Sequence, residues 1–319
     1  MSKKYHIAAL GELLIDFTDA GYGSGGMKLF EQNPGGAPAN LLTAAAHMGC
    51  RTAFIGKVGK DMHGVFLKET LRNEGIDVSG IIEDENYFTT LAFVEIDADG
   101  ERHFSFARKP GADTMLGVNE LDRDIITNCE IFHFGSLSLT DEPSKSATIE
   151  AVKTAAKSGA VISYDPNYRA SLWKNREIAI KEMKAAVSYA DVMKVSDEES
   201  LLLTGAGDYE SAADKLLLMG PEIVAVTLGC EGVLIASKGK KEIIPGFKVE
   251  AVDTTGAGDS FWGGFLSRLL EGGKSWENIK KCAIRGNALA SLCIQKRGGI
   301  PAIPSKEQVD EITCVFFKN

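Results

Sequence analysis

A glycine-rich segment near residue 256 combines the residue types that bind and transfer an anion. In Asp253-Thr-Thr-Gly-Ala-Gly-Asp-Ser-Phe261, Gly256 and Gly258 let the backbone approach a ligand closely, and an apolar, helix-like stretch follows. The first turn of a helix has unpaired N–H groups and a partial positive charge, so the amides around Gly256, Ala257 and Gly258 can hold an anion. Asp259 beside them can accept the proton of a substrate hydroxyl. The same spacing also fits a simple turn in which Asp259 only caps the helix.

Two segments near the N-terminus offer polar groups suited to a polyol. In Asn33-Pro-Gly-Gly-Ala-Pro-Ala-Asn40, Gly35 and Gly36 permit close backbone approach, and Asn40 supplies both a donor and an acceptor. Asp16 follows a short apolar run and can accept hydrogen bonds from two hydroxyl groups. The alternative interpretations are an ordinary helix N-terminus for the first segment and a water-facing edge residue for Asp16.

The sequence lacks the common signatures of other sites. Phe261 stands where a Rossmann fingerprint has its third glycine, and no segment matches the Walker A pattern. The five histidines show no metal-ligand spacing. The six cysteines form no C-x-x-C pair, so we expect reduced, mostly buried thiols.

Short apolar runs alternate with helix-like stretches along the chain and must position these residues. The runs are continuous rather than alternating, which favours strands buried on both faces of a parallel sheet with helices on either side. The expected strands are His6–Leu10, Thr52–Ile55, Ile131–Phe134, Val161–Tyr164, Val192–Val195 and Ile223–Leu228. The expected helices are one capped by Asp61 and ended by Gly75, then Lys145–Ser158, Glu177–Tyr189, Thr255–Leu270 and Trp276–Gln295, with Gly272 and Gly273 breaking the last two.

Two segments depart from this alternation. Thr89–Ile96 and Arg102–Arg108 flank Asp97-Ala-Asp-Gly100, which predicts a β-hairpin, and Leu13–Phe17 is followed by the glycine-rich Gly21–Gly26. We expect these strands to form a small separate sheet that covers a site or pairs with another subunit. No linker or repeat divides the chain, so we expect a single domain over residues 1–319, with these strands, roughly 12–31 and 87–109, inserted in it.

Composition excludes several functional classes. The 319 residues carry a formal net charge of −9, which disfavours binding to nucleic acids or anionic membranes. The N-terminus does not look like a secretory signal, and no apolar run approaches the roughly 18 residues of a membrane span. We therefore expect a cytoplasmic enzyme. Its 34 glycines exceed the usual share of about 7%.

Taken together, three segments resemble the pfkB (ribokinase-like) family of carbohydrate kinases. Asp253–Phe261 is similar to the family's C-terminal signature, Gly35–Asn40 to its glycine motif, and Gly11–Asp16 to its first strand and sugar-binding aspartate; motifs recur in order to about residue 304. The resemblance implies a three-layer α/β/α sandwich with a mostly parallel central sheet, in which the small sheet is a lid over the sugar. Finer similarity to fructokinases lies in Asn33–Asn40, Tyr164–Arg169 followed by Leu172-Trp173, Lys194–Glu199 and Arg108–Asp113.

The family also implies a role for each matching residue. Asp259 would be the general base, and the amides of Gly256, Ala257 and Gly258 the anion hole. The sugar would be held by Asp16, Gly35, Gly36 and Asn40, and the ATP by Thr227, Gly229, Gly232 and Asn287. Arg108 and Arg169 fit either contacts with substrate or structural ion pairs, and the ion pair is favoured for Arg169.

The resemblance further implies metal ions and a partner. Glu199 would position Mg²⁺ through water, with Ser196 replacing the family's asparagine beside the nucleotide. A monovalent cation such as K⁺ would lie near Asp253, Thr255, Cys293, Lys296 and Gly298, although Ala302 replaces a serine ligand. Many members dimerise through the lid, which implies a homodimer.

These features lead to one main hypothesis and two alternatives. The main one is an ATP-dependent fructokinase that phosphorylates O6 of D-fructose. The nearest alternative keeps the chemistry and changes the acceptor to 2-keto-3-deoxygluconate or to a ribosyl nucleoside such as aminoimidazole riboside. The other is a non-catalytic, fructokinase-like interaction protein, which the presence of Asp259, Gly256, Gly258, Asp16 and Asn40 disfavours.

Overall fold

A large, mostly parallel sheet forms the centre of the molecule. The computed structural model describes residues 3–96 and 102–316. Within these residues, nine strands form a sheet in the order β13-β12-β11-β10-β9-β8-β1-β4-β5. Neighbouring strands pair in parallel, except that β12 pairs antiparallel with both β11 and β13 at one edge. The bounds are β1 Tyr5–Leu10, β4 Thr52–Gly59, β5 Asp77–Asp84, β8 Cys129–Gly135, β9 Val161–Asp165, β10 Val192–Ser196, β11 Ile223–Thr227, β12 Gly232–Ser237 and β13 Lys240–Pro245.

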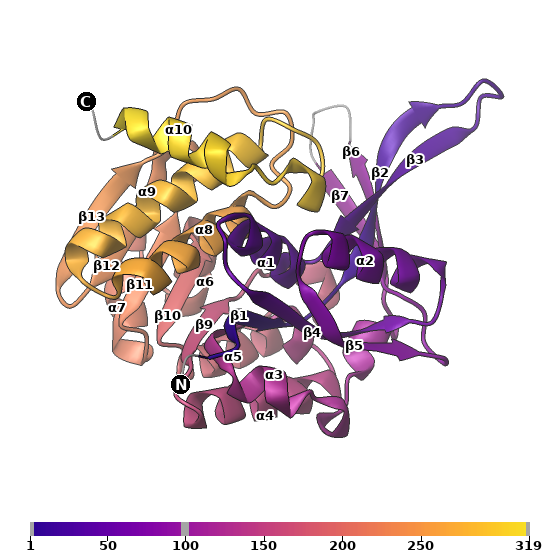
Figure 1. The fold of residues 1–319 in the computed structure, drawn as a ribbon, viewed down its shortest axis with the longest axis horizontal. Coiled ribbons are helices and arrows are strands. Elements are labelled where there is room, and N and C mark those ends of the chain that lie inside the picture. Colours follow the sequence, from indigo (N-terminus) through magenta and orange to yellow (C-terminus); the bar gives the residue numbers. More distant parts are fainter. Residues whose placement is uncertain (1–2, 97–101, 317–319) are drawn as a thin grey trace.

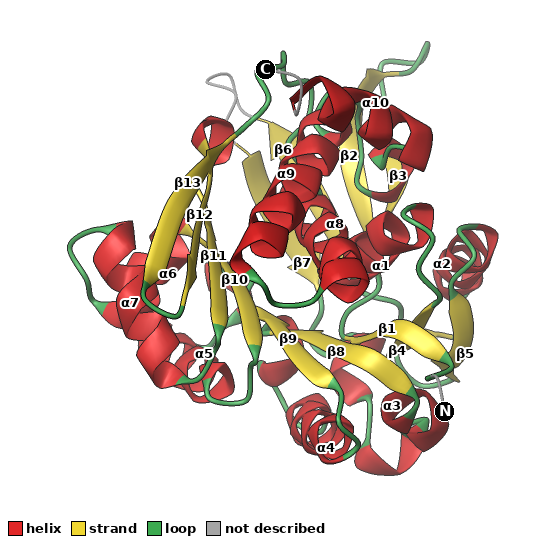
Figure 2. Cartoon of the chain, turned by 60° about the vertical axis from the view of Figure 1, so that its left-hand side comes forward, coloured by secondary structure: helices red, strands yellow, loops and turns green. Residues whose placement is uncertain are grey.

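Helices cover both faces of this sheet (Figure 2). One face carries α1 (Ala37–His47), α2 (Met62–Asn73), α8 (Ala257–Gly272) and α9 (Trp276–Cys293), with α10 (Lys306–Phe316) packed on α9. The other carries α3 (Arg123–Thr127), α4 (Ser144–Lys157), α5 (Arg176–Val187), α6 (Asp197–Thr204) and α7 (Tyr209–Met219). Short 3₁₀ helices lie at Ala112–Met115, Val118–Glu120, Leu137–Leu139, Ala170–Leu172, Gly229–Glu231 and Ile300–Ala302.

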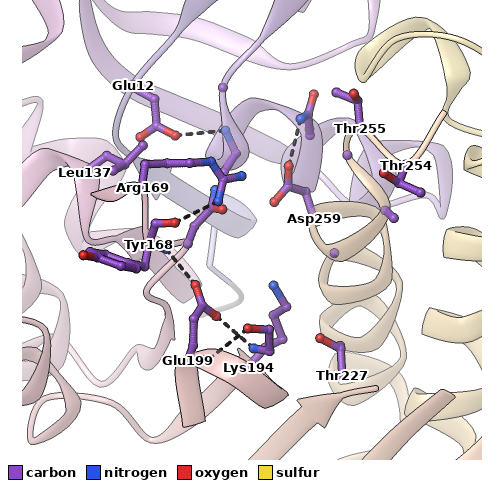
Figure 3. A pocket seen from close by; sticks show the side chains of 18 of the residues that line it. Glu12, Leu137, Tyr168, Arg169, Lys194, Glu199, Thr227, Thr254, Thr255 and Asp259 are labelled. Atoms are coloured by element: carbon purple, nitrogen blue, oxygen red, sulfur yellow. Dashed lines mark hydrogen bonds between the residues drawn. The ribbon is translucent and has the colours of Figure 1, made fainter. Parts of the chain in front are cut away.

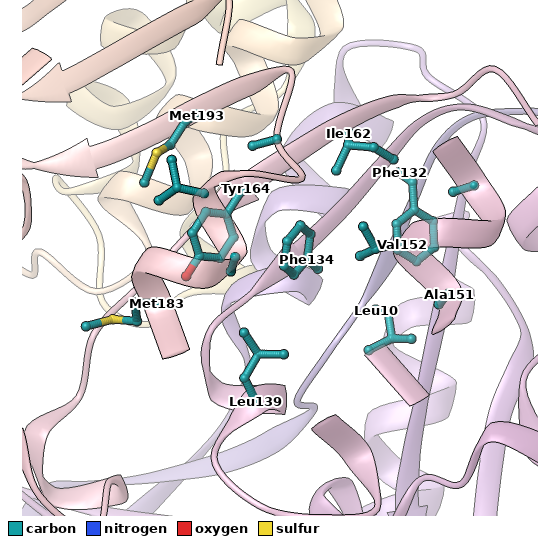
Figure 4. Close-up of a cluster of buried hydrophobic side chains, with 14 of the residues drawn as sticks. Leu10, Phe132, Phe134, Leu139, Ala151, Val152, Ile162, Tyr164, Met183 and Met193 are labelled. Atoms are coloured by element: carbon teal, nitrogen blue, oxygen red, sulfur yellow. The ribbon is translucent and has the colours of Figure 1, made fainter. Parts of the chain in front are cut away.

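The apolar runs of the parallel strands supply the core on both faces. On the α4 and α5 side, Phe132, Phe134 and Tyr164 are fully buried, and the rings of Phe134 and Tyr164 stack at 4.7 Å (Figure 4). On the other side, Trp262 of α8 is fully buried and donates from its indole N–H to Ser163 Oγ of β9 at 2.8 Å. Ser163 thereby fixes α8 against the sheet.

A second, four-stranded sheet projects from this body (Figure 1). It consists of β2 (Leu14–Tyr22), β3 (Lys28–Gly35), β6 (Leu91–Ile96) and β7 (Arg102–Ala107), in the order β3-β2-β6-β7. β6 and β7 pair antiparallel from Leu91 to Ile96, while the turn expected at 97–100 lies outside the described residues. β2 begins shortly after β1, the first strand of the core sheet, ends. Asp16, near the start of β2, therefore lies where the small sheet joins the core.

The three-layer α/β/α architecture with a small additional sheet confirms the expected fold class. Asp61 caps α2, because its Oδ1 accepts the amides of His63 and Gly64 at 3.0 and 2.9 Å, and Gly75 follows the end of the helix with a φ of 77°. The sequence interpretation did not identify β5, β12, β13, α6, α7 or α10. All six cysteines are free thiols; Cys230 and Cys314 are exposed.

Candidate active site

The carboxyl ends of five neighbouring core strands open into one cavity of about 890 Å³. Residues directly at or after the ends of β1, β8, β9, β10 and β11 line it, together with the N-termini of α1 and α8. Strand order reverses at β1, with later strands on both sides, and such a switch point is where open α/β sheets bind ligands. The cavity has the volume of a typical small-molecule site.

The N-terminus of α8 forms one wall of this cavity. Gly256 precedes the helix with a φ of 75°, a left-handed conformation that favours glycine, and no described side chain caps the helix. Gly256, Ala257 and Gly258 all line the cavity. The Ala257 amide donates to the Thr254 carbonyl at 3.3 Å, so the anion-binding role that the spacing predicts for this turn stays a prediction.

Asp259, the third residue of α8, lies on the same wall (Figure 3). Its Oδ2 accepts a hydrogen bond from Asn40 Nδ2 of α1 at 2.8 Å. Burial raises the pKa of Asp259 to about 6, and Lys194 opposes this rise. The carboxylate is thus mainly ionised at neutral pH but retains an appreciable proton affinity, which suits a general base.

The residues expected to hold the sugar lie at or beside the same cavity. Asp16 of β2 lines the cavity, and burial raises its pKa to about 7, although Arg169 acts to lower it. Gly35 itself does not line the cavity; a Cβ there would collide with the Asp16 carboxylate, so the glycine makes room for Asp16. Gly36, with a φ of 119°, lines the cavity, as does Asn40, whose Oδ1 is buried without a described hydrogen-bond partner.

The structural ion pair that the sequence interpretation favoured for Arg169 is formed by Arg108, whose role that interpretation left open. Arg108 is buried and does not line the cavity: its Nε donates to Asp113 Oδ2 at 2.8 Å and its Nη2 to the Leu137 carbonyl at 2.8 Å. Arg169 is exposed, lines the cavity, and donates from Nη1 to the Tyr168 carbonyl at 3.0 Å. The ion pair therefore belongs to Arg108, and Arg169 is the arginine placed to meet a substrate.

Glu199 and Ser196 form a capping box at the start of α6 beside the cavity. Ser196 Oγ accepts the Glu199 amide at 3.1 Å, and Glu199 Oε2 accepts the Ser196 amide at 2.8 Å. The other oxygen of Glu199, Oε1, accepts the Tyr168 amide at 2.7 Å, as Figure 3 shows. Glu199 therefore fastens the loop that carries Arg169 to α6. Each of its oxygens can accept a further hydrogen bond, and Glu199 lines the cavity.

The expected ATP residues divide into two groups. Thr227, at the end of β11, lines the cavity and donates from Oγ1 to the Val195 carbonyl at 3.3 Å. Gly229, Gly232 and Asn287 do not line the cavity. Asn287 Nδ2 instead donates to the carbonyls of Ile244 and Pro245 at 3.1 and 3.0 Å, which ties α9 to the end of β13.

The residues that match the family's monovalent cation site lie close to one another beside the start of α8. Asp253 accepts the amides of Thr255 and Gly298 at 2.8 and 3.0 Å, and Cys293 Sγ lies 3.7 Å from the Thr255 carbonyl. Lys296 is exposed, and its amide bonds to the Cys293 carbonyl at 3.2 Å. Of these five residues, Thr255 also lines the cavity. In the described ranges, no three His, Cys, Asp or Glu side chains are grouped as a metal site would require.

Sequence reasoning assigned no role to several residues that line the cavity. Glu12 is buried, and its Oε1 accepts the Ala37 amide at 3.0 Å, so it fixes the N-terminus of α1; burial raises its pKa to about 7. Lys194 lies near the end of β10. Both residues stand inside the segments that carry the family resemblance. The sequence signal that could have identified them is a charged residue at the end of an apolar strand. The remaining ones include Asn167, Tyr168, Arg176 and Glu198.

Comparison with known proteins shows the family of this chain. Residues 4–306 match the model of the pfkB family carbohydrate kinases. The chain belongs to the pfkB family of carbohydrate kinases. It is 41% identical over 316 residues to a probable fructokinase-5 of Arabidopsis thaliana, with 96% of each chain covered.

Solved kinases of this family share the fold. A Xylella fastidiosa fructokinase with bound ATP has a TM-score of 0.91 at 31% identity, covering 98% of each chain. A fructokinase double mutant of Vibrio cholerae with fructose, ADP and a potassium ion has a TM-score of 0.88 at 30% identity, covering 98% of this chain and 99% of that one. Aminoimidazole riboside kinase of Salmonella enterica has a TM-score of 0.84 at 25% identity, covering 97% of this chain and 99% of that one.

The helices in the described part of the chain include none with the length and apolar character that a membrane span requires.

Proposed function

We propose that this protein is an ATP-dependent fructokinase that transfers the γ-phosphoryl group of ATP to O6 of D-fructose. The observation that carries the proposal is Asp259, which stands in a cavity beside the uncapped N-terminus of α8. Identity of about 40% to plant fructokinases over nearly the whole chain, and the likeness to fructokinase structures with ATP or with fructose and ADP, support fructose as the acceptor.

The cavity provides the parts that phosphoryl transfer requires. Asp259 takes the proton of the acceptor hydroxyl, and Asn40 holds its carboxylate in place at 2.8 Å. The α8 amides bind the oxygens of the transferred group, where negative charge develops. Asp16, which lines the same cavity, accepts hydrogen bonds from sugar hydroxyls, and Thr227 contacts the nucleotide. The reaction is thus promoted by positioning and charge rather than by a covalent intermediate.

The proposal includes Mg²⁺ beside Glu199. Carboxylate oxygens are the donors Mg²⁺ prefers, each Glu199 oxygen can accept a further bond, and Glu199 lines the cavity. Bound there with its waters, Mg²⁺ would neutralise phosphate charge. For K⁺, Asp253 and the neighbouring carbonyl groups offer oxygen donors next to α8. A rise in kcat with K⁺, absent with a large organic cation, would support that site.

A homodimer formed through the small sheet is also part of the proposal. The β2–β3 end of this sheet exposes Tyr22, Met27, Leu29 and Phe30, and Met27 is 77% exposed. A second copy of the chain would cover these apolar side chains. A cytoplasmic location stays a prediction.

Measurement of ADP release across a panel of acceptors tests the proposed function. Fructose should give the highest kcat/KM, with product phosphorylated at O6 as read by phosphorus and carbon NMR. A higher kcat/KM with 2-keto-3-deoxygluconate or aminoimidazole riboside would replace fructose as the acceptor. Of these two alternative acceptors, Arg169 at the cavity wall favours 2-keto-3-deoxygluconate, because an exposed guanidinium can bind the carboxylate of a sugar acid.

A further inference from the structure

We propose that Lys194 is a further catalytic residue, whose ammonium group contacts the phosphoryl group during transfer. The proposal rests on the proposed kinase activity of the same cavity. Lys194 stands in the segment Lys194–Glu199 that carries the family resemblance, but none of the roles derived from that resemblance is assigned to it.

Lys194 reaches the anion-binding turn of α8 from the sheet. Its residue is 6% exposed, yet it lines the cavity, and in Figure 3 its side chain points from β10 toward the space between Arg169 and Asp259. A Cβ on Gly258 would lie 2.8 Å from Lys194 Nζ and 3.4 Å from its Cε. The ammonium group is therefore within van der Waals reach of the backbone whose amides bind the anion.

Asp165 of β9 holds this ammonium group in place. Asp165 Oδ2 accepts from Lys194 Nζ at 2.9 Å, and Asp165 Oδ1 accepts the Asn167 amide at 3.1 Å. An ammonium group has three N–H donors, and within the described residues Asp165 is its one hydrogen-bonded acceptor. Two donors are left for an anion in the cavity.

The ammonium group stays protonated in this position. Burial acts to lower the pKa of Lys194, but the carboxylates of Asp165, Glu199 and Asp259 raise it above its ordinary value. Of the three basic residues that line the cavity, Arg169 and Arg176 are exposed and Lys194 is buried. A charge shielded from water acts more strongly on a nearby phosphate.

A purely structural role explains the Asp165–Lys194 pair less well. Replacing a buried ion pair by apolar residues is often neutral or stabilising, so such a pair is weak evidence of a contribution to stability. Here Lys194 also lines a cavity together with five carboxylates: Glu12, Asp16, Glu198, Glu199 and Asp259. A polyphosphate entering this cavity needs a cation fixed near its terminal phosphorus.

The proposed step is balanced without proton transfer by Lys194. The sugar hydroxyl oxygen forms the new bond to the γ-phosphorus while the bond from that phosphorus to the β,γ-bridging oxygen breaks. The hydroxyl proton goes to Asp259, and ADP leaves with the electrons of the broken bond. Lys194 donates hydrogen bonds to the non-bridging oxygens of the transferred group and compensates their charge.

Two substitutions and a matched control test the proposal. Lys194→Met removes the charge at similar length, and Lys194→Arg retains it. The control is Lys57→Met, because Lys57 is also buried, with Nζ 3.0 Å from Asp84 Oδ2 and 2.6 Å from Glu120 Oε1, but does not line the cavity. We expect K194M to lower kcat about 10²–10³-fold, K194R to recover part of it, and K57M to leave kcat unchanged in the folded protein.

Measurements of nucleotide binding distinguish contact of Lys194 with the phosphoryl group from a purely structural role, and they do not depend on which sugar is the acceptor. By calorimetry with Mg²⁺, K194M should bind a non-hydrolysable ATP analogue about tenfold more weakly while binding ADP as the wild type does. This comparison holds whichever sugar is the acceptor, whereas failure of the proposed function would appear as wild-type protein inactive on fructose. Unchanged kcat and an unchanged ATP-analogue-to-ADP ratio in K194M would overturn the proposal.

A structure of the wild type guards against a K194M variant that does not fold. With ADP, Mg²⁺, beryllium fluoride and sugar bound, Lys194 Nζ should lie within about 3.2 Å of a fluoride that replaces a phosphoryl oxygen. An Nζ that contacts Asp165 alone, with no fluoride in hydrogen-bond range, would also overturn it.

Discussion

At the scale of single residues, the environment of Asp259 decides how the site reacts. The carboxylate is surrounded by Asn40 from α1, Lys194 from β10, Asp165 from β9 and Arg169 from the following loop. Asn40 fixes its orientation by a hydrogen bond. Lys194, Asn40 and Arg169 oppose the rise in the pKa of Asp259 that burial causes, whereas the charge of Asp165 adds to it. The chemistry of the cavity therefore depends on one carboxylate whose neighbours come from four different parts of the chain.

Asp259→Asn should abolish most of the activity without loss of the fold. The amide preserves the shape of the side chain but cannot take a proton, so kcat should fall by about 10²–10⁴-fold. Asp208→Asn is the control, because Asp208 caps the exposed start of α7 and asparagine caps equally well. Coupled ADP-release kinetics and thermal melting curves measure both. A D259N variant with wild-type kcat would exclude Asp259 as the base.

The pH dependence of kcat and of sugar KM should differ. Burial raises the pKa of Asp259 to about 6 and that of Asp16 to about 7. Each acts as the ionised acceptor, so activity is present above the pKa and is lost as pH falls through it. We expect kcat to fall below about pH 6, and sugar KM to rise already below about pH 7. Steady-state kinetics from pH 5 to 9 check this, and a kcat constant down to pH 5 would contradict it.

Of the glycines expected at the site, Gly36, Gly256 and Gly258 line the cavity, whereas Gly35, Gly229 and Gly232 do not. Gly256 and Gly258 were interpretable because local backbone geometry gives them their role. Arg108 and Arg169 were not, because their partners depend on the tertiary fold: Arg108 meets the Leu137 carbonyl only after β8 has joined the sheet. Lys194 is similar, since its acceptor Asp165 lies 29 residues away on the neighbouring strand.

At the scale of elements, short junctions set the positions of the catalytic groups. The β3–α1 junction turns at Gly36, whose φ of 119° lets the chain pass close to the Glu12 carbonyl. Glu12 then accepts the Ala37 amide, and α1 presents Asn40 to Asp259 at the distance of one hydrogen bond. A substitution at this junction therefore acts on Asp259 through the first turn of α1, which carries Asn40.

Gly36→Ala should destabilise the protein and impair catalysis together. The new Cβ would collide with the Glu12 carbonyl in a backbone conformation that alanine rarely adopts, so we expect a loss of about 2 kcal/mol or more in the free energy of unfolding. Gly25→Ala is the control, because nothing lies within 4 Å of a Cβ there. Urea unfolding and kcat measure the effect. Equal stability of the two variants would contradict this account of the junction.

The expected elements were those with strong, continuous apolar patterns. The parallel strands fall within a few residues of their expected bounds, as β9 at Val161–Asp165 shows. The strand β12 was missed although its run is apolar and fully buried. The strand β13 was missed because it is largely exposed and lysine-rich at its start, so it lacks the apolar pattern of a core strand. Such edge strands take their place from pairing partners rather than from local composition.

At the scale of the whole molecule, the small sheet links the site to the protein's surroundings. Asp16 on β2 lines the cavity, while the far end of the same hairpin exposes Leu29 and Phe30. Assembly through that end would fix the strand that carries Asp16. Oligomeric state and sugar binding should therefore change together.

Leu29→Glu should weaken the proposed dimer and raise the KM for sugar. A charge on the apolar end of β2–β3 opposes its burial in an interface. Leu218→Glu is the control, because Leu218 is 89% exposed on α7, away from the small sheet. Analytical ultracentrifugation at micromolar concentration, with sugar kinetics on the same samples, measures both effects. A wild-type protein that sediments as a monomer would contradict the proposed assembly.

The position of β1 between β4 and β8 has a consequence for synthesis in the cell. Leu10 pairs with Ile55 on one side but with Phe134 on the other, 124 residues further along the chain. At about 5–20 residues per second, a ribosome needs about 6–25 s to make that stretch. During this interval the growing chain exposes one open edge of an apolar strand, which invites pairing with other chains. The nascent protein should therefore depend on chaperones most before residue 135 emerges.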